Sequence, residues 1–238
     1  MKDYIELNKQ TYNELAEEYF ARLVKYDIFY HIVGEKICET IFNIDDIKMK
    51  LKSGQGIRVL ELGCGPGAIL QALKNYPRVK AYAVDFSDRM VFFAKKSNEE
   101  AIIKVKNVLD INDIDDLFGE KLQGNVDVLI MAAFIHLFPR NDAEQILQKA
   151  KNWVSDGGII YLDTTEEKEF SDGQIRVKKK INGREICPLR TRWTRKDFNA
   201  FLTHCGYDII LQKEHLANNG KKWLRTIIRV CKDNERKE

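Results

Sequence analysis

The residues best suited to chemistry form a turn of alternating glycines at the end of an apolar segment. Glu61 lies at the end of that segment, and Gly63, Gly65 and Gly67 follow at every second position. Glycine lets the backbone turn sharply and approach a ligand closely, because it has no Cβ. The spacing differs from the dinucleotide fingerprint, Pro66 removes one N–H donor from the next helix, and an acid here would repel phosphate. The turn is therefore predicted to bind a ligand by a different mode.

Two aspartates follow the next two apolar segments. Asp85 comes eighteen residues after Gly67, where a carboxylate can accept hydrogen bonds from both hydroxyls of a ribose. Asp110 follows the third apolar segment and could accept a hydrogen bond from an adenine amino group. Together with the glycine turn, these positions predict a crevice that binds a nucleoside.

An alternation of short β-rich runs and helical patterns must position these residues. Strands are expected at 57–62, 79–84, 102–105, 126–131 and 159–163, and helices at 68–75, about 87–97 and 141–154. Strands that alternate with helices predict a parallel, doubly wound α/β sheet with right-handed crossovers. The first strand-to-helix turn of such a sheet lies in the crevice where ligands bind.

The chain is expected to form a single domain over residues 1–238 with additions to this core. The expected parts are a helical cap or lid at 1–52, a ligand-binding core at 53–165, an inserted hairpin at 166–193 and a closing helix with strands at 194–238. The helices of 1–52 either pack on the sheet or cover its carboxyl edge. In the insert, Asn182-Gly183 indicates a type I′ turn that pairs Ile181 with Arg184 and Lys179 with Ile186.

Composition excludes several classes of protein. The chain has 238 residues, 44% hydrophobic, with 39 Lys+Arg against 36 Asp+Glu, which is too apolar and too balanced in charge for a disordered chain. Its longest apolar run, Val128–Ile135, is too short for a bilayer span, and no secretory leader is visible. Five scattered cysteines without a C-x-x-C motif argue against a zinc ribbon or a disulfide framework. We expect a soluble cytoplasmic protein without a metal ion, a membrane partner or a nucleic-acid partner.

Taken in order, these features resemble the motifs of class I S-adenosylmethionine-dependent methyltransferases. The resemblance runs over about 57–163 and includes the glycine turn, Asp85, Asp110, the strand that holds Asp127 and the Gly157-Gly158 turn. It implies a Rossmann-like seven-stranded sheet of order 3-2-1-4-5-7-6, with strand seven antiparallel, and S-adenosylmethionine as cofactor.

The resemblance also implies a role for each matching residue. Gly63, Gly65 and Gly67 would wrap the methionine part of the cofactor, while Glu61 would orient the turn or the cofactor amino group. Asp85 would hold the ribose hydroxyls.

Three further positions complete the implied cofactor site. Phe86 would stack on the adenine, and Asp110 with the Ile111 backbone would bind the adenine edge. The backbone near Ala132, after the fourth strand, would accept from the cofactor ammonium group.

Candidate residues for the methyl acceptor carry alternatives. His136 follows the fourth strand and, with an ordinary pKa of about 6.5, could act as a base, orient the acceptor or only line the site. Tyr12 and Tyr19 are spaced either for a lid or for core packing. Arg184 and Arg192 could grip an acceptor carboxylate or phosphate, or belong to a solvated surface.

The sequence thus predicts methyl transfer to a small-molecule acceptor, which could be anionic. The end of the fourth strand lacks the Asn/Asp-Pro-Pro-aromatic tetrad of amino-methylating DNA and RNA enzymes. One alternative is an RNA or protein methyltransferase that uses residues 172–197, a segment with nine basic and three acidic residues. The other is a non-catalytic cofactor-binding scaffold of the same fold. Neither the methylated atom nor the oligomeric state follows from the sequence.

Overall fold

The computed structural model describes residues 3–25, 28–176, 179–181, 184–186, 188–217 and 220–232, with side chains described except at 28–31, 174–176, 179–181 and 184–186. The chain divides into two compact units. The first unit is Met1–Asp113 with Arg176–Leu189, and the second unit is Ile114–Ile175 with Arg190–Glu238. The single-domain organisation over residues 1–238 stays a prediction.

A seven-stranded sheet has the order β10-β11-β5-β4-β1-β2-β3. Its strands are β1 (Ile57–Leu62), β2 (Val79–Asp85), β3 (Ile102–Val105), β4 (Val126–Met131), β5 (Val154–Thr165), β10 (Asp208–Leu216) and β11 (Lys222–Arg229). Numbered along the chain, these seven strands have the order 3-2-1-4-5-7-6, and the seventh runs antiparallel to β5. The predicted Rossmann-like fold class is therefore confirmed.

In the first unit, parallel strands β1, β2 and β3 are joined by short helices. The helices of this unit are α1 (Asp3–Val24), α2 (Ile28–Phe42), α3 (Asp45–Lys52), α4 (Ala68–Leu73), α5 (Asp88–Ser97) and the 3-10 turn η1 (Val108–Asp110). Five of the six β1 residues are buried, as expected for a parallel strand covered on both faces. The crossovers through α4 and α5 step in one direction along the sheet, so right-handedness places both helices on one face.

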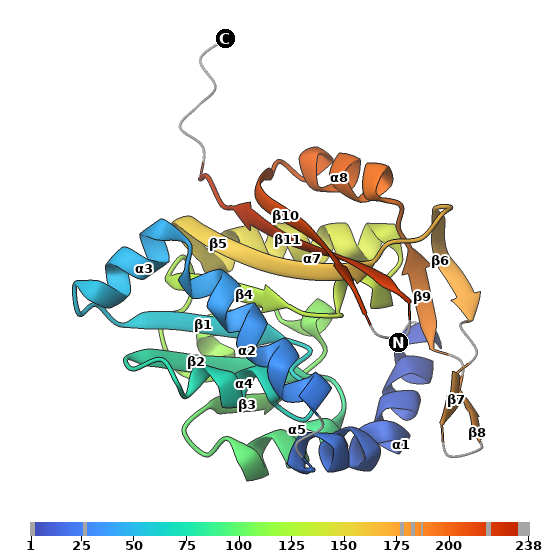
Figure 1. Ribbon diagram of the computed structural model, residues 1–238. Coiled ribbons are helices and arrows are strands. Elements are labelled where there is room, and N and C mark those ends of the chain that lie inside the picture. Colours follow the sequence, from blue (N-terminus) through green and yellow to red (C-terminus); the bar gives the residue numbers. More distant parts are fainter. Residues whose placement is uncertain are drawn as a thin grey trace. The chain divides into compact units, whose positions relative to one another are not determined.

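The N-terminal helices pack on these crossover helices. Figure 1 shows α2 beside α4, and α2 carries Gly34 where a Cβ would lie 2.9 Å from the Ala68 carbonyl oxygen. The helix α1 packs on α5. The helices α1 and α2 thus pack on the core of this unit, and a cap or lid role of residues 1–52 stays a prediction.

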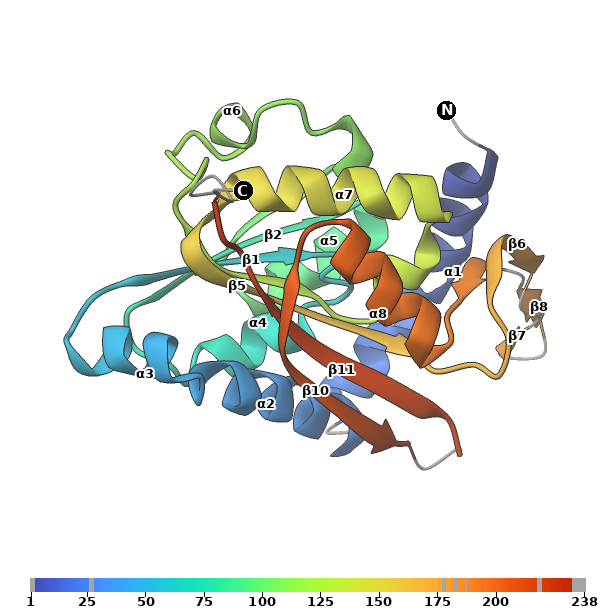
Figure 2. The same cartoon turned by 90° about the horizontal axis from the view of Figure 1, so that it is seen from above.

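In the second unit, β4 and β5 are parallel, while β5, β11 and β10 form an antiparallel series. Figure 2 shows β10 and β11 as a long pair with α8 beside β10. The helical elements of this unit are α6 (Ile114–Phe118), the 3-10 turn η2 (Ile135–Leu137), α7 (Arg140–Trp153) and α8 (Arg195–His204). Thr194 caps α8 by accepting from the Asp197 N–H at 3.1 Å, so the helix begins where its sequence predicts.

The inserted segment contains a second strand pair besides the predicted hairpin. Strands β7 (Lys179–Ile181) and β8 (Arg184–Ile186) pair with the predicted register, Ile181 with Arg184 and Lys179 with Ile186. The predicted turn at 182–183 lies outside the described residues. A second pair, β6 (Ser171–Arg176) with β9 (Leu189–Arg192), was not predicted.

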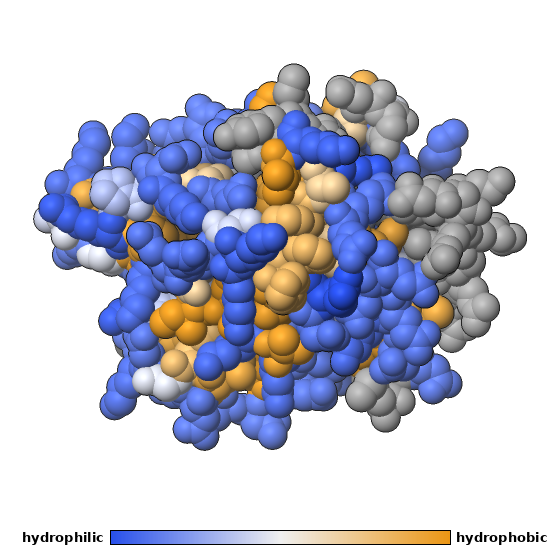
Figure 3. Space-filling model, turned by 90° about the horizontal axis from the view of Figure 1, so that it is seen from below, coloured by the Kyte–Doolittle hydropathy of each residue, from blue (hydrophilic) through white to orange (hydrophobic). Residues whose placement is uncertain are grey.

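The surface is mostly hydrophilic, with apolar side chains between the charged ones. Phe92 in α5 and Met49 in α3 are exposed, and Figure 3 shows apolar residues gathered on one face with hydrophilic residues around them. Within the described residues, every helix is too short or too polar to cross a membrane.

Candidate functional site

The glycine turn after β1 has a conformation that favours glycine at each of the three predicted positions. Gly63, Gly65 and Gly67 have φ values of 74°, 51° and 92°. A Cβ on Gly67 would clash with the Asn98 amide and lie 3.3 Å from the Ala94 Cα. A Cβ on Gly65 would meet no described atom within 4 Å. The turn is thus tightly packed at Gly67 and open at Gly65.

Asp85 ends β2 and holds the glycine turn. Its Oδ2 accepts from the Gly65 N–H at 2.9 Å, and its Oδ1 accepts from the Ser87 N–H at 2.9 Å. Burial raises the pKa of Asp85 to about 6, although backbone hydrogen bonds from Ser87, Gly65 and Phe86 oppose the shift. Each carboxylate oxygen has a second lone pair, so the ionised group keeps capacity to accept from a ligand.

Glu61 is a second buried carboxylate in the same unit. Its side chain is 3% exposed, and its Oε2 is buried without a hydrogen-bond partner among the described residues. Burial and the negative charge of Asp85 raise the pKa of Glu61 well above its usual value. A buried acceptor with no donor is unfavourable. The pair is therefore suited to a ligand that brings a positive charge or N–H donors.

Aromatic side chains lie beside this turn. The rings of Tyr12 in α1 and Phe86 have centroids 6.1 Å apart at an angle of 56°. Asn13, the next residue in α1, donates to Asp88 Oδ1 at 3.1 Å and accepts from the Ser87 hydroxyl at 2.5 Å. These bonds tie α1 to the start of α5, which places Tyr12 against Phe86.

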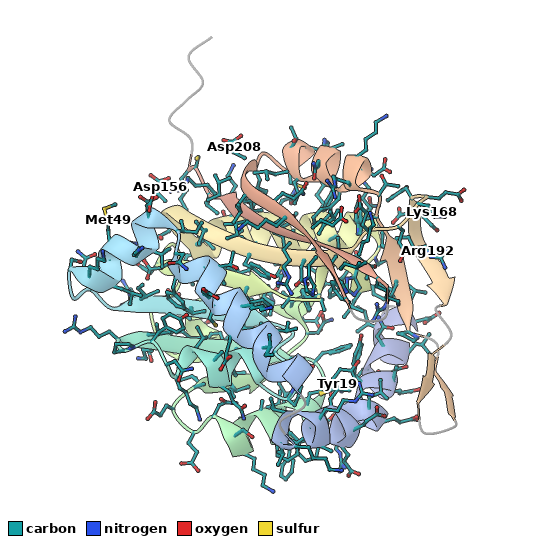
Figure 4. The ribbon with its side chains drawn as sticks, in the orientation of Figure 1. Tyr19, Met49, Asp156, Lys168, Arg192 and Asp208 are labelled. Carbon is teal, nitrogen blue, oxygen red and sulfur yellow. The ribbon has the colours of Figure 1, made fainter. Side chains whose placement is uncertain are left out.

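Tyr19 follows Tyr12 by seven residues in the same helix, α1 (Figure 4). Tyr12 and Tyr19 are both partly buried and pack against a cluster of Leu15, Ala16 and Met90. Both tyrosines thus contribute to packing in the first unit.

Asp110 and Ile111 follow β3, the neighbour of β2 in the sheet. Asp110 is exposed, and its Oδ2 accepts from the Asn107 side chain at 3.3 Å. Ile111 is buried. Asn107 also accepts from the Leu109 N–H at 3.2 Å, which fixes the short turn that carries Asp110.

In the second unit, the segment after β4 is held by a residue that the sequence reasoning missed. Ala133 is not a glycine, yet its φ is 51°, which costs about 1–2 kcal/mol in an L-residue. Its N–H donates to Asp163 Oδ1 at 2.5 Å, and the Tyr161 hydroxyl donates to Asp163 Oδ2 at 3.0 Å. Asp163 follows the apolar part of β5, two residues before the strand ends, and an aspartate after an apolar run is the same signal that pointed to Asp85. Ala132 lies between β4 and this residue.

His136 is fully buried in η2, and its ring lies 6.0 Å from the ring of Trp223, centroid to centroid. The following residues are held by the insert. The Thr191 hydroxyl of β9 donates to the Phe138 carbonyl at 2.5 Å, and a Cβ on Gly173 of β6 would lie 2.8 Å from the Pro139 Cβ. The β6–β9 pair thus packs on the chain immediately after η2.

The structure describes the side chain of one of the two predicted arginines. Arg192, at the end of β9, is partly buried and appears in Figure 4. The side chain of Arg184 lies outside the described residues. Arg190, two positions before Arg192, has a buried Nε without a hydrogen-bond partner within the described part of the chain.

The structure therefore brings together Glu61, the three glycines, Asp85, Phe86 and Tyr12 in the first unit. Ala132, His136 and Arg192 belong to the second unit. Among the described residues, no three His, Cys, Asp or Glu side chains are grouped so that they could hold a metal ion.

Comparison with known proteins identifies the type of domain. Residues 60–160 match the family model of a methyltransferase domain. Malonyl-[acyl-carrier protein] O-methyltransferase of Bacillus anthracis is 29% identical over 159 residues, which is 66% of this chain and 55% of that protein. The protein of the same name from Bacillus cereus is 28% identical over 188 residues, which is 77% of this chain and 65% of that protein.

These two curated relatives are longer than the part that this chain matches, since it spans 55% and 65% of their lengths. Among solved structures, a DhpI–SAM–HEP complex shares the fold, with a TM-score of 0.68 and 16% identity over 95% of this chain and 98% of that one.

Proposed function

We propose, from the methyltransferase domain at residues 60–160 and the class I S-adenosylmethionine-dependent methyltransferase fold that surrounds it, that this protein transfers a methyl group to a small carboxylate-bearing acceptor. The observation that carries the proposal is the buried pair of Glu61 and Asp85 beside the open position at Gly65.

The residues of the first unit fit S-adenosylmethionine. This cofactor supplies a methyl group on a positively charged sulfur and carries an ammonium group and a ribose with two hydroxyls. No donor among the described residues reaches Glu61 Oε2, and a cationic ligand would favour the ionised form of both buried carboxyl groups. Asp85 can accept from the ribose hydroxyls, and Phe86 offers a ring for the adenine.

Asp110 and the backbone of Ile111 are proposed to bind the adenine edge, as the exposed Asp110 carboxylate allows. Gly63, Gly65 and Gly67 let the backbone approach the methionine part of the cofactor. The carbonyl of Ala132 is proposed to accept from the cofactor ammonium group.

The acceptor side of the proposal rests on His136 and Arg192 of the second unit, on Arg184 of the first unit and on the relatives. Relatives named for methylation of a malonyl group support an acceptor with a free carboxylate. A carboxylate is ionised at neutral pH, so it attacks without a base. We therefore propose that His136 orients the acceptor, while Arg192 and Arg184 attract its charge. The protein mainly holds the reacting atoms in line and excludes water.

The experiment that tests the proposed function has two stages. Isothermal titration with S-adenosylmethionine and S-adenosylhomocysteine comes first, and micromolar binding is expected. Transfer of labelled methyl is then measured to malonyl-acyl-carrier protein, free short dicarboxylic acids, transfer RNA and protein substrates.

Formation of a base-labile methyl ester on an acceptor that carries a carboxylate would support the proposal. Absence of binding to either ligand contradicts the cofactor assignment. Binding without transfer to any acceptor would favour the scaffold alternative, and transfer only to transfer RNA or a protein side chain would favour the polymer alternative.

A further inference from the structure

The segment after β4 contains a residue in a conformation that its type does not favour. Ala133 has a φ of 51° and is exposed to solvent. An alanine has no side-chain hydrogen bond with which to stabilise this left-handed conformation, unlike asparagine or aspartate. Such strain persists only where the surrounding structure fixes it, and it concentrates at functional sites.

The group that fixes Ala133 is the side chain of Asp163. Met131, the last residue of β4, pairs with Leu162, so Asp163 lies one residue beyond the end of the β4–β5 ladder. Its Oδ1 accepts from the Ala133 N–H at 2.5 Å, in place of the missing ladder bond. Asp163 itself is 5% exposed.

Two neighbours fix the Asp163 carboxylate in turn. The Tyr161 hydroxyl donates to its Oδ2 at 3.0 Å. Burial raises the pKa of Asp163, and the Ala133 N–H, the Tyr161 hydroxyl and the charge of Arg225, its register partner on β11, oppose this shift. The carboxylate is thus kept as an oriented acceptor whose two oxygens have different partners.

We propose that Asp163 is a positioning residue, which holds Ala133 in its left-handed conformation and so presents the backbone of the 132–136 segment to the cofactor and acceptor. The inference rests on the proposed function, because Ala132 and His136 belong to this segment. Asp163 touches neither reactant and acts only through the backbone of Ala133.

The experiment compares Asp163→Ala, Asp163→Asn and Ala133→Gly with the wild-type protein. The first readout is the hydrogen-exchange rate of the Ala133 amide, measured by NMR without ligand. The second is the affinity for S-adenosylhomocysteine, measured by titration calorimetry. The matched control is Asp127→Asn, which changes a different buried aspartate, in β4, and is expected to alter neither the exchange rate nor the affinity.

Loss of a charge-assisted hydrogen bond should raise Ala133 exchange and weaken S-adenosylhomocysteine binding by about tenfold each in Asp163→Ala. Asp163→Asn keeps one acceptor oxygen for Ala133 and is expected to stay within about threefold of wild type. Glycine adopts a positive φ without strain, so a double variant that combines Asp163→Ala with Ala133→Gly should lose only about threefold in affinity.

Unchanged exchange at Ala133 in Asp163→Ala would overturn the proposal. Faster exchange at Ala133 with unchanged S-adenosylhomocysteine affinity and an unchanged KM for the methyl acceptor would also overturn it, because Asp163 would then serve the fold alone. If Asp163→Ala does not fold, Tyr161→Phe removes the donor to Oδ2 and is expected to raise Ala133 exchange about threefold; an unchanged rate counts against the proposal.

The two proposals fail in different ways. A wild-type protein that binds neither cofactor form contradicts the proposed function. The exchange rates of Ala133 still decide whether Asp163 holds the segment, since they are measured without ligand.

Discussion

Asp85 connects the strand that it ends to the turn before it, and it is buried. Its two oxygens accept from Gly65 and Ser87, so the same carboxylate that orders the turn is proposed to bind the ribose. Its raised pKa of about 6 brings its titration close to neutral pH, so both roles become sensitive to pH.

We predict opposite effects of pH on folding and on cofactor binding through Asp85. The folded pKa of about 6 exceeds the ordinary value of 3.8, so between these values the native state binds more protons than the unfolded state. The free energy of unfolding should therefore rise as the pH falls through this window. S-adenosylhomocysteine affinity should fall there, because a protonated carboxyl accepts fewer hydrogen bonds.

Thermal unfolding and titration calorimetry at several pH values check this prediction. Asp85→Asn should flatten the contribution of this group to both profiles and weaken S-adenosylhomocysteine binding by about tenfold at neutral pH. Parallel pH profiles in the variant and the wild type would show that another group, such as Glu61, causes the dependence.

At the scale of elements, the glycine turn and the β6–β9 pair have separate tasks. The turn is open at Gly65 and closed at Gly67. The β6–β9 pair packs against the residues that follow His136, through Thr191 and Gly173. The turn is proposed to bind the cofactor, and the β6–β9 pair supports the segment that carries a candidate side chain.

Gly65→Ala and Gly67→Ala should separate binding from stability. Both residues have positive φ, which costs about 1–2 kcal/mol for alanine. Only at Gly67 does the new Cβ also meet Asn98 and Ala94. Urea unfolding should show the larger loss of stability for Gly67→Ala, whereas Gly65→Ala should lose only the backbone cost in stability and also lose S-adenosylhomocysteine affinity. Equal losses of stability would contradict this account of the turn.

Thr191→Val should release β9 from the chain after η2. The substitution keeps the side-chain volume and removes the hydrogen bond to the Phe138 carbonyl, so the free energy of unfolding should fall by about 1 kcal/mol. Turnover should fall as well, because the residues after His136 lose a fixed contact. Thr203→Val, at an exposed position of α8, is the control, and equal effects of the two variants would rule out a specific role for Thr191.

At the scale of the whole molecule, charge is unevenly distributed along the sequence. The chain has a net charge of +3, and residues 172–197 alone carry nine basic and three acidic residues. A concentration of positive charge of this size suits either a small anionic acceptor or a polymer with many phosphates.

Salt dependence should distinguish these two partners. A small carboxylate makes one or two ionic contacts, so its KM should rise by only about threefold between about 50 and 200 mM salt. A nucleic acid held by six or more phosphate contacts would lose about a thousandfold in affinity over the same range. Steady-state kinetics with the best acceptor provide the measurement, and a steep loss would favour the polymer alternative.

The sequence by itself determined the succession of strands and helices along the core and the main candidate residues for binding the cofactor. Apolar runs that alternate with helical patterns predict a parallel sheet, and a glycine turn at its first strand predicts the ligand-binding edge. Gly63, Gly65 and Gly67 do adopt positive φ, because local sterics restrict that conformation largely to glycine. The register of the β7–β8 hairpin followed from its two-residue turn in the same way.

Only the tertiary structure decided which polar groups are buried together. The bond from Ala133 to Asp163 and the pairing of β6 with β9 join residues that lie apart in the sequence. Glu61 Oε2 is buried without a hydrogen-bond partner in the described part of the chain, which its own sequence neighbourhood does not predict. No local pattern encodes these contacts, because burial and long-range pairing depend on what the rest of the chain packs around each group. Side-chain type and spacing fix local geometry, whereas the partners of a buried carboxylate are fixed by the fold.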